Sequence, residues 1–265
     1  MKTTSIFLAG IFVINLLANV SEASPFDLEF SEHHEIEEFI KQQNSLISAS
    51  PKKPKHYVLR GDAYFLLADF EKSVADYTRA LKLDDKQNEA YLGRGLALAR
   101  SGWIEEGIKE LDIYIKRNPE SSLAYTKRGV RRLWLGEQDG AQSDFEKALE
   151  LDPSNAEAHD DLGVILSRKG LYFQAADHFI SAIEYEPSYQ KAYHNLALIS
   201  YLTKKDELAL GFINTAVELN PNAKGSMLLK SQILAALGYA DDAKELQENA
   251  EFLPEGNWSE SVPLQ

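Results

Sequence analysis

The stretch that decides the fold runs from residue 156 to residue 189 and reads AEAHDDLGVILSRKGLYFQAADHFISAIEYEPSY. Related stretches of the same length precede and follow it without insertion. They start at Pro54, Asn88, Ser122, Ala156, Gln190 and Lys224. A fixed period of this size predicts a row of similar units, each of which buries its apolar face mainly on its neighbours.

Two places in each window hold only small residues. The eighth place reads Gly61, Gly95, Gly129, Gly163, Ala197 and Ser231, and the twentieth reads Ser73, Gly107, Ala141, Ala175, Ala209 and Ala243. Small residues twelve places apart in an apolar helical pattern allow two antiparallel helices to approach closely. Each window therefore predicts a helical hairpin. Glycines mark the inner turn of four hairpins, at Gly102, Gly136, Gly170 and Gly238, and prolines close four windows, at Pro119, Pro153, Pro187 and Pro221.

Large apolar residues fill the remaining seam positions. They are Tyr57, Tyr91, Tyr125 and Tyr193 at the fourth place, and Tyr77, Leu111, Phe145, Phe179 and Ile213 at the twenty-fourth. Together with the small residues and the closing prolines, this set resembles the tetratricopeptide repeat. The resemblance covers residues 54 to about 255. It implies an all-α fold: a right-handed superhelical solenoid of antiparallel helix pairs, preceded here by a signal peptide.

The period and the chain ends together predict the organisation of the chain. Residues 36–47 have amphipathic helical spacing and stand where the second helix of a preceding repeat would stand, which predicts a capping half-repeat. The expected segments are a signal peptide at 1–23, this capping segment at 24–53, repeats at 54–87, 88–121, 122–155, 156–189 and 190–223, a capping repeat at 224–254, and a flexible tail at 255–265.

The first 23 residues have the pattern of a secretory signal. Lys2 gives a positive start, residues 6–20 are almost wholly apolar, and Ser21, Glu22 and Ala23 form a small-residue cleavage site. The alternative is an uncleaved membrane anchor, for which the apolar run is short and contains Asn15. We therefore expect a secreted chain, periplasmic or extracellular, with no stable membrane insertion after cleavage.

Composition argues against polyanionic partners. The chain has 28 Lys and Arg against 41 Asp and Glu, a net charge of −13. Such a chain is a poor match for nucleic acid or anionic lipid as a whole. No glycine-rich phosphate loop, catalytic carboxylate pair or metal-ligand spacing is present in the sequence, so we expect no enzyme activity, no cofactor and no metal. His159 stands in a column of tyrosines and is expected to be packed.

One charged pattern has an explanation inside the repeat. Arg60, Arg94 and Arg128 share the seventh place, and Asp76, Glu110 and Asp144 share the twenty-third. In the next two windows both members are lost together, to Leu162 with His178 and to Leu196 with Phe212. We therefore predict an Arg–carboxylate bridge within each of the first three hairpins. Of the basic run that surrounds Arg128, Lys127 and Arg131 are expected to be free.

The resemblance also implies where a partner would bind. In this family the first helices line a concave groove that holds extended peptides or short helices. The fifth and ninth places of successive windows would then face the groove, with Lys127 and Asp161 beside them. The resulting candidates are Val58, Asp62, Leu92, Leu96, Thr126, Lys127, Val130, Asp160, Asp161, Val164, His194 and Leu198.

Leu96, Val130, Val164 and Leu198 form an aliphatic stripe that predicts a protein-binding surface, flanked by Asp62, Asp160, Asp161 and Lys127. The alternative is that the repeats curl tightly enough to bury this stripe. The expected function is a non-catalytic scaffold or adaptor that binds a peptide or helix of a partner protein. The alternatives are a self-associating structural component of an envelope assembly, which would be a homo-oligomer, and a solute-binding accessory protein.

Overall fold

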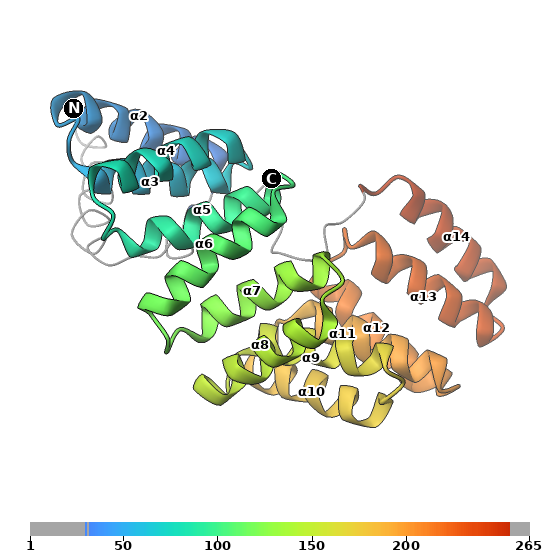
Figure 1. Cartoon of the computed structure of the whole chain (residues 1–265). Coiled ribbons are helices and arrows are strands. Elements are labelled where there is room, and N and C mark those ends of the chain that lie inside the picture. The colour runs from blue at the N-terminus through green and yellow to red at the C-terminus, as the bar shows by residue number, and fades with distance from the viewer. Residues whose placement is uncertain (1–29, 31, 255–265) are drawn as a thin grey trace, which may run out of the picture. The chain divides into compact units, whose positions relative to one another are not determined.

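The computed structural model describes Phe30 and residues 32–254 of the 265-residue chain. The expected signal peptide at 1–23 and the expected tail at 255–265 lie outside the described residues. Every regular element in the described part is a helix (Figure 1), and successive helices form antiparallel pairs. The all-α fold predicted from the sequence is therefore confirmed.

The described residues fall into two compact units that meet between Tyr114 and Ile115, and each is described by itself. The first contains the helices α2 (His33–Ala49), α3 (Pro54–Leu66), α4 (Phe70–Leu83) and α5 (Asn88–Arg100), and most of α6 (Ile104–Arg117). The second contains α7 (Ser122–Trp134), α8 (Gln138–Leu151), α9 (Ala156–Arg168), α10 (Tyr172–Tyr185), α11 (Gln190–Leu202), α12 (Asp206–Leu219), α13 (Lys224–Ala236) and α14 (Ala240–Glu251).

The hairpins follow the sequence period closely. The first helix of each of the six pairs begins at the first residue of its 34-residue window. The four turn glycines all adopt the left-handed conformation, with φ between 77° and 92°. Ala68 and Lys204 take the same conformation in the two hairpins that lack this glycine, with φ of 56° and 59°. All six turns therefore have the same backbone geometry, although two of them lack glycine at this position.

The small residues at the eighth and twentieth places lie where paired helices cross. A Cβ atom placed on Gly107 would lie 2.5 Å from the carbonyl oxygen of Gly95. A Cβ on Gly163 would lie 2.6 Å from the ring of Phe179, which is 1 % exposed. Both distances are well below van der Waals contact, so only glycine fits at these crossings. The capping helix α2 packs against α3 through Ile36, Phe39, Ile40, Leu59 and Ala63.

The three predicted Arg–carboxylate bridges are present, each joining the two helices of one hairpin. Arg60 Nη2 lies 2.6 Å from Asp76 Oδ1, Arg94 Nη2 lies 2.8 Å from Glu110 Oε2, and Arg128 Nη2 lies 2.6 Å from Asp144 Oδ1. In the fourth and fifth hairpins Leu162, Leu196 and Phe212 instead pack in the apolar core. In the fifth hairpin the ion pair is therefore replaced by apolar packing, whereas in the fourth the carboxylate position is held by His178, which contacts His159.

His159 is packed, as expected from its place in a column of tyrosines. Its Nε2 lies 3.0 Å from the carbonyl oxygen of Pro153, and its Nδ1 lies 2.9 Å from Nδ1 of His178. Since a carbonyl oxygen can only accept, Nε2 of His159 donates to Pro153. Burial lowers the pKa of His178, and the neighbouring His159 lowers it further. The two rings therefore pack against each other within the hairpin.

Candidate functional site

The groove residues predicted in the first unit are all buried. Val58 is 7 % exposed, Asp62 and Leu92 are fully buried, and Leu96 is 1 % exposed. Val58 packs in an apolar cluster, and Asp62 accepts a hydrogen bond from Tyr77 Oη at 2.6 Å. The expectation that Leu96 and Asp62 present an open wall is therefore wrong, because both side chains are used inside the scaffold.

The predicted residues of the second unit divide into two groups. Four of them are buried: Thr126, Lys127, Val130 and Asp160. Two members of the predicted aliphatic stripe, Leu96 and Val130, are therefore inaccessible to a partner. The remaining members of the predicted set are only partly buried, and all four lie on α9 and α11: Asp161, Val164, His194 and Leu198. Helices α9 and α11 contact each other directly. The structure thus reduces the predicted groove in this unit to one wall made by two helices.

Polar contacts tie this wall to the preceding first helix, α7. Lys127 Nζ lies 2.7 Å from Glu157 Oε2, so the expectation that Lys127 is free is wrong. Burial opposes ionisation of Glu157, but the charges of Lys127, Lys191 and Arg131 together outweigh it and hold the pKa of Glu157 below its ordinary value. Arg131 is fully buried, with its guanidinium carbon 4.7 Å from the ring centroid of Trp134. It too is part of the scaffold.

A second polar contact joins α9 to α11. Asn195 Nδ2 donates to Asp160 Oδ1 at 2.8 Å. Burial raises the pKa of Asp160 to about 6, although the bond from Asn195 opposes this rise. Burial, together with the charges of Glu157 and Asp160, raises the pKa of Asp161 well above its ordinary value. Ionising this stretch of α9 is therefore costly, and a cationic or hydrogen-bond-donating group placed beside Asp161 would reduce that cost.

A third contact joins α11 to α13. Ser226 Oγ lies 3.1 Å from His194 Nδ1 and accepts a hydrogen bond from Gln190 Nε2 at 2.8 Å. Burial lowers the pKa of His194 to about 4, so its imidazole is neutral at neutral pH. The hydroxyl proton of Ser226 can then be donated to His194. The partly exposed wall is therefore held between partly buried polar contacts on both sides.

Sequence reasoning missed the partners of these contacts. They are Glu157, Gln190, Asn195 and Ser226. A signal was present, since each contact joins residues about one period apart, such as Lys127 with Glu157 and Asp160 with Asn195. These residues form polar pairs between equivalent helices of adjacent repeats. The pairs predicted from the sequence were all within a single hairpin, so the prediction did not include them.

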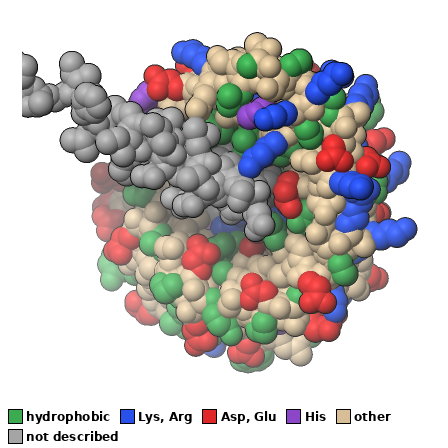
Figure 2. Space-filling model, turned by 90° about the vertical axis from the view of Figure 1, so that its left-hand side faces the viewer, with side chains coloured by type: hydrophobic (Ala, Val, Ile, Leu, Met, Phe, Trp, Pro, Cys, Tyr) green, Lys and Arg blue, Asp and Glu red, His purple; other side chains and the backbone are tan. Residues whose placement is uncertain are grey.

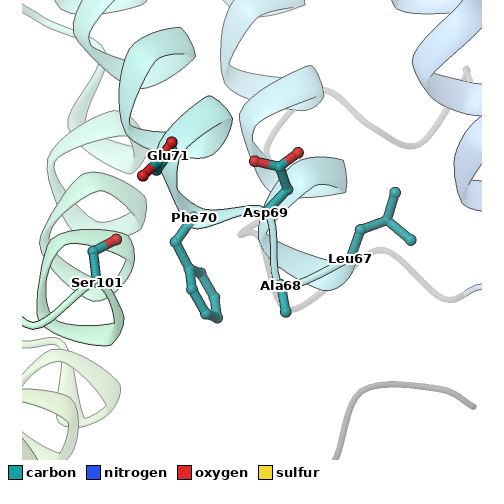
Figure 3. Close-up of a pocket in the computed structure, with 6 residues that line it drawn as sticks. All are labelled: Leu67, Ala68, Asp69, Phe70, Glu71 and Ser101. Carbon is teal, nitrogen blue, oxygen red and sulfur yellow. The ribbon is translucent and has the colours of Figure 1, made fainter.

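An open depression of a different kind lies in the first unit (Figure 3). Leu67, Ala68, Asp69, Phe70, Glu71 and Ser101 line it, at the turn between α3 and α4 and at the end of α5. Asp69 accepts a hydrogen bond from the backbone N–H of Lys72 and so caps α4. Asp69 is thus used for capping, and the Ser101 hydroxyl donates to the carbonyl oxygen of Ala97. Of the polar residues that line the depression, this leaves Glu71 alone, which is no converging set of functional groups.

Residues 32–254 contain neither a metal-binding cluster nor a membrane-spanning helix. No group of three or more His, Asp or Glu side chains there could hold a metal ion. None of the helices in that part of the chain is long and apolar enough to cross a bilayer. Neither finding extends to the residues that the structure does not describe.

Comparison with known families gives the decisive observation. A model described as "TPR repeat" matches residues 61–102, and two models described as "Tetratricopeptide repeat" match residues 145–176 and 161–224. The chain is a tetratricopeptide repeat protein. The resemblance predicted from the repeat columns is therefore confirmed. No curated protein sequence matches this tetratricopeptide repeat protein at a significant level.

Solved structures share its fold at low sequence identity. The structure described as the APC/C hetero-tetramer Cut9–Hcn1 is 17 % identical with a TM-score of 0.73, and the match covers 91 % of this chain but 52 % of that chain. This tetratricopeptide repeat protein thus spans about half the length of that relative. PilF of Pseudomonas aeruginosa is 14 % identical with a TM-score of 0.68, covering 79 % of this chain and 95 % of PilF.

A third structure is described as YrrB, a TPR protein with an unusual peptide-binding site. It is 20 % identical with a TM-score of 0.52, and the match covers 71 % of this chain and 97 % of YrrB. At these identities the three likenesses show the fold alone. The matched repeat families indicate a protein–protein interaction scaffold.

Proposed function

We propose that the chain is a non-catalytic binding module that holds a peptide or short helix of a partner protein against α9 and α11. The observation that carries the proposal is the set of partly exposed side chains on these two helices, Asp161, Val164, His194 and Leu198. Val164 and Leu198 pack against the core with part of each side chain and supply apolar surface with the rest. Asp161 supplies a carboxyl group that burial and the neighbouring Glu157 and Asp160 make costly to ionise. Apolar burial would provide affinity and the carboxylate would select orientation.

The rigidity of the wall supports the same function. Lys127 with Glu157, Asn195 with Asp160, and Gln190 with Ser226 join α7, α9, α11 and α13 through bonds between neighbouring first helices. A surface that is already ordered loses little conformational entropy when a ligand binds. A single-peptide site of this size typically gives a dissociation constant on the order of 1 μM.

The test places a photo-crosslinking residue at Asp161 in the mature protein in its native host and identifies crosslinked peptides by mass spectrometry. We expect one dominant partner segment that contains apolar residues. The double change Val164→Glu and Leu198→Glu should abolish its capture. Leu208→Glu with Leu219→Glu, two exposed leucines on α12, is the matched control and should leave capture unchanged.

Two results would contradict the proposal. Equal loss of capture in both double variants would show that added negative charge, and not the α9–α11 wall, is responsible. Crosslinks only to a second copy of this chain, with a mass that rises with concentration in light scattering, would instead establish the self-associating structural function.

We also propose that the protein acts outside the cytoplasm. This rests on the signal pattern of residues 1–23 alone. Amino-terminal sequencing of the protein purified from its host tests it, and a mature chain that begins at Ser24 is expected. A chain in the cytoplasmic fraction that retains residues 1–23 would contradict it.

A further inference from the structure

Five exposed basic side chains gather at one edge of the first unit, where α2 turns into α3 and where α4 ends. We call this set the basic edge: Lys52, Lys53, Lys55, Arg79 and Lys82. The guanidinium carbon of Arg79 lies 5.9 Å from the ring centroid of Tyr57, and Tyr57 Oη donates to the carbonyl oxygen of Pro51 at 3.1 Å. These contacts bring the end of α4 to the lysine-bearing turn.

Within the described part of the chain, the side chains of the basic edge have no carboxylate partners, whereas three other cations of the same unit do. Arg60, Arg94 and Lys72 each form an ion pair with Asp or Glu. Among the described residues, no side chain of the basic edge forms an ion pair with a carboxylate or a hydrogen bond. The charges of Arg60 and Arg94 are therefore neutralised within their hairpins, whereas the positive charges of the basic edge are not.

Acidic residues near the edge do not cancel its charge. Asp84 and Asp85 follow Lys82 directly, and Lys86 comes next. Asp84 accepts bonds from the backbone N–H of Lys86 and from Gln87 Nε2, which lower its pKa, so it remains ionised within its own turn. Including this turn, the local balance is six basic against two acidic side chains in a chain whose net charge is −13.

The placement of two of these lysines costs the helix stability. Lys53 is the N-cap residue of α3 and Lys55 is in its first turn, which contains no acidic residue. The N-terminus of a helix carries partial positive charge, so cations there are unfavourable. Burial lowers the pKa of the adjacent His56, and the charges of Lys53 and Lys55 lower it further. A positive field that the fold itself does not need is thus concentrated at this turn.

Figure 2 shows most of the Lys and Arg side chains of the displayed face towards its upper right, with Asp and Glu side chains both among them and over the rest of the face. Pro51 and Pro54 bracket Lys52 and Lys53, and fixed proline φ angles limit the freedom of the turn. A restricted turn presents its charges at low entropic cost.

We propose that the basic edge is a docking surface for a short acidic segment of a partner protein. A short segment lies wholly within the local positive field, which extends about 8 Å at physiological salt. An extended polyanion, such as a lipid bilayer or a nucleic acid, would also face the negative remainder of the chain and be repelled by it. The chemistry therefore favours a peptide rich in Asp and Glu. This surface is separate from the α9–α11 wall.

The test measures fluorescence anisotropy of a labelled twelve-residue Glu- and Asp-rich peptide with the mature protein at 50 and 150 mM NaCl. We expect saturable binding that weakens with salt. Lys52→Glu, Lys53→Glu and Lys55→Glu together should reduce affinity at least tenfold. Because these changes place acids at a helix N-terminus, this variant should not lose helicity.

The matched control carries the same charge change in the second unit, as Lys204→Glu, Lys205→Glu and Lys244→Glu. It should change affinity by less than threefold, and the Val164→Glu, Leu198→Glu variant should bind the acidic peptide normally. Equal weakening by both triple variants would overturn the proposal, as would no binding at 50 mM NaCl. Binding of vesicles containing 30 % phosphatidylglycerol but not of the peptide would also overturn it, in favour of a lipid surface.

Discussion

Two hairpin turns hold a side chain where the other four use glycine. Ala68 and Lys204 have φ near +60°, a region that costs an L-residue roughly 1–2 kcal/mol. Glycine relieves this cost but gains conformational freedom in the unfolded chain. Ala68→Gly and Lys204→Gly should therefore each stabilise the protein by about 0.5–1 kcal/mol, measured by urea denaturation followed by circular dichroism.

Ala75→Gly, at an exposed helical position of α4, is the matched control and should destabilise by about 1 kcal/mol. The same chemical change thus has opposite signs at the two sites. A loss of stability in Ala68→Gly would show that its methyl group makes contacts worth more than the backbone strain.

Asp160 and His194 should make opposing contributions to the pH dependence of stability. The folded-state pKa of Asp160 is raised to about 6, so between pH 6 and its ordinary pKa near 4 the folded state binds more protons than the unfolded one. Its contribution therefore increases as pH falls. The folded-state pKa of His194 is lowered to about 4, so the unfolded state binds more protons below pH 6.5, and its contribution decreases as pH falls.

Single variants should separate these two effects. Relative to wild type, Asp160→Asn should be more stable at pH 7, by on the order of 2 kcal/mol, with the difference disappearing by pH 4. His194→Gln should improve relative to wild type as pH is lowered from 7 to 4. Urea denaturation at successive pH values measures both, and a pH-independent difference for either variant would contradict its assignment.

At the scale of helix pairs, the two residues of each Arg–carboxylate bridge should be energetically coupled, and an apolar pair should be able to replace them. Arg94 and Glu110 are 18 % and 16 % exposed, so removing one leaves a charge that is poorly solvated. We expect Arg94→Leu or Glu110→Phe alone to cost about 3 kcal/mol, and the double variant about 1 kcal/mol. The double variant reproduces the combination found at Leu196 and Phe212.

A double-mutant cycle on the free energy of unfolding measures this coupling. Additive costs would mean that Arg94 contributes through packing alone. The control cycle pairs Arg94 with Lys72, a residue of another hairpin that bonds to Asp69, and should show no coupling.

At the scale of the whole molecule, a repeat architecture predicts that damage stays local. The helices of each unit contact only their near neighbours in the chain. A Cβ on Gly107 would lie 2.5 Å from a backbone oxygen, whereas one on the exposed Gly211 of α12 would meet nothing within 4 Å. Gly107→Ala should therefore speed amide hydrogen exchange in α5 and α6, with the effect fading by α13 and α14.

Gly211→Ala is the control. It should slow exchange in α12 and stabilise it by about 1 kcal/mol, because alanine is the better helix former. Uniformly faster exchange along the whole chain in Gly107→Ala would indicate that the two units unfold as one cooperative block.

The sequence alone determined the helical hairpins, their register and the seams within them. A 34-residue period repeats the same local requirements, so the small residues at Gly95 and Gly107, the turn glycines and the Arg94–Glu110 pair could be identified by aligning the chain with itself. These features depend on contacts within one hairpin, which sequence spacing encodes directly.

Only the tertiary structure decided which side chains of the first helices remain accessible. Leu96 and Val130 hold the same repeat place as Val164 and Leu198, yet the first two are buried and the last two are partly exposed. Exposure at this place depends on how closely successive repeats pack, and on polar contacts such as Lys127 with Glu157 that join residues a period apart. Packing between repeats is a cooperative property of several helices, so the pattern within one window does not specify it.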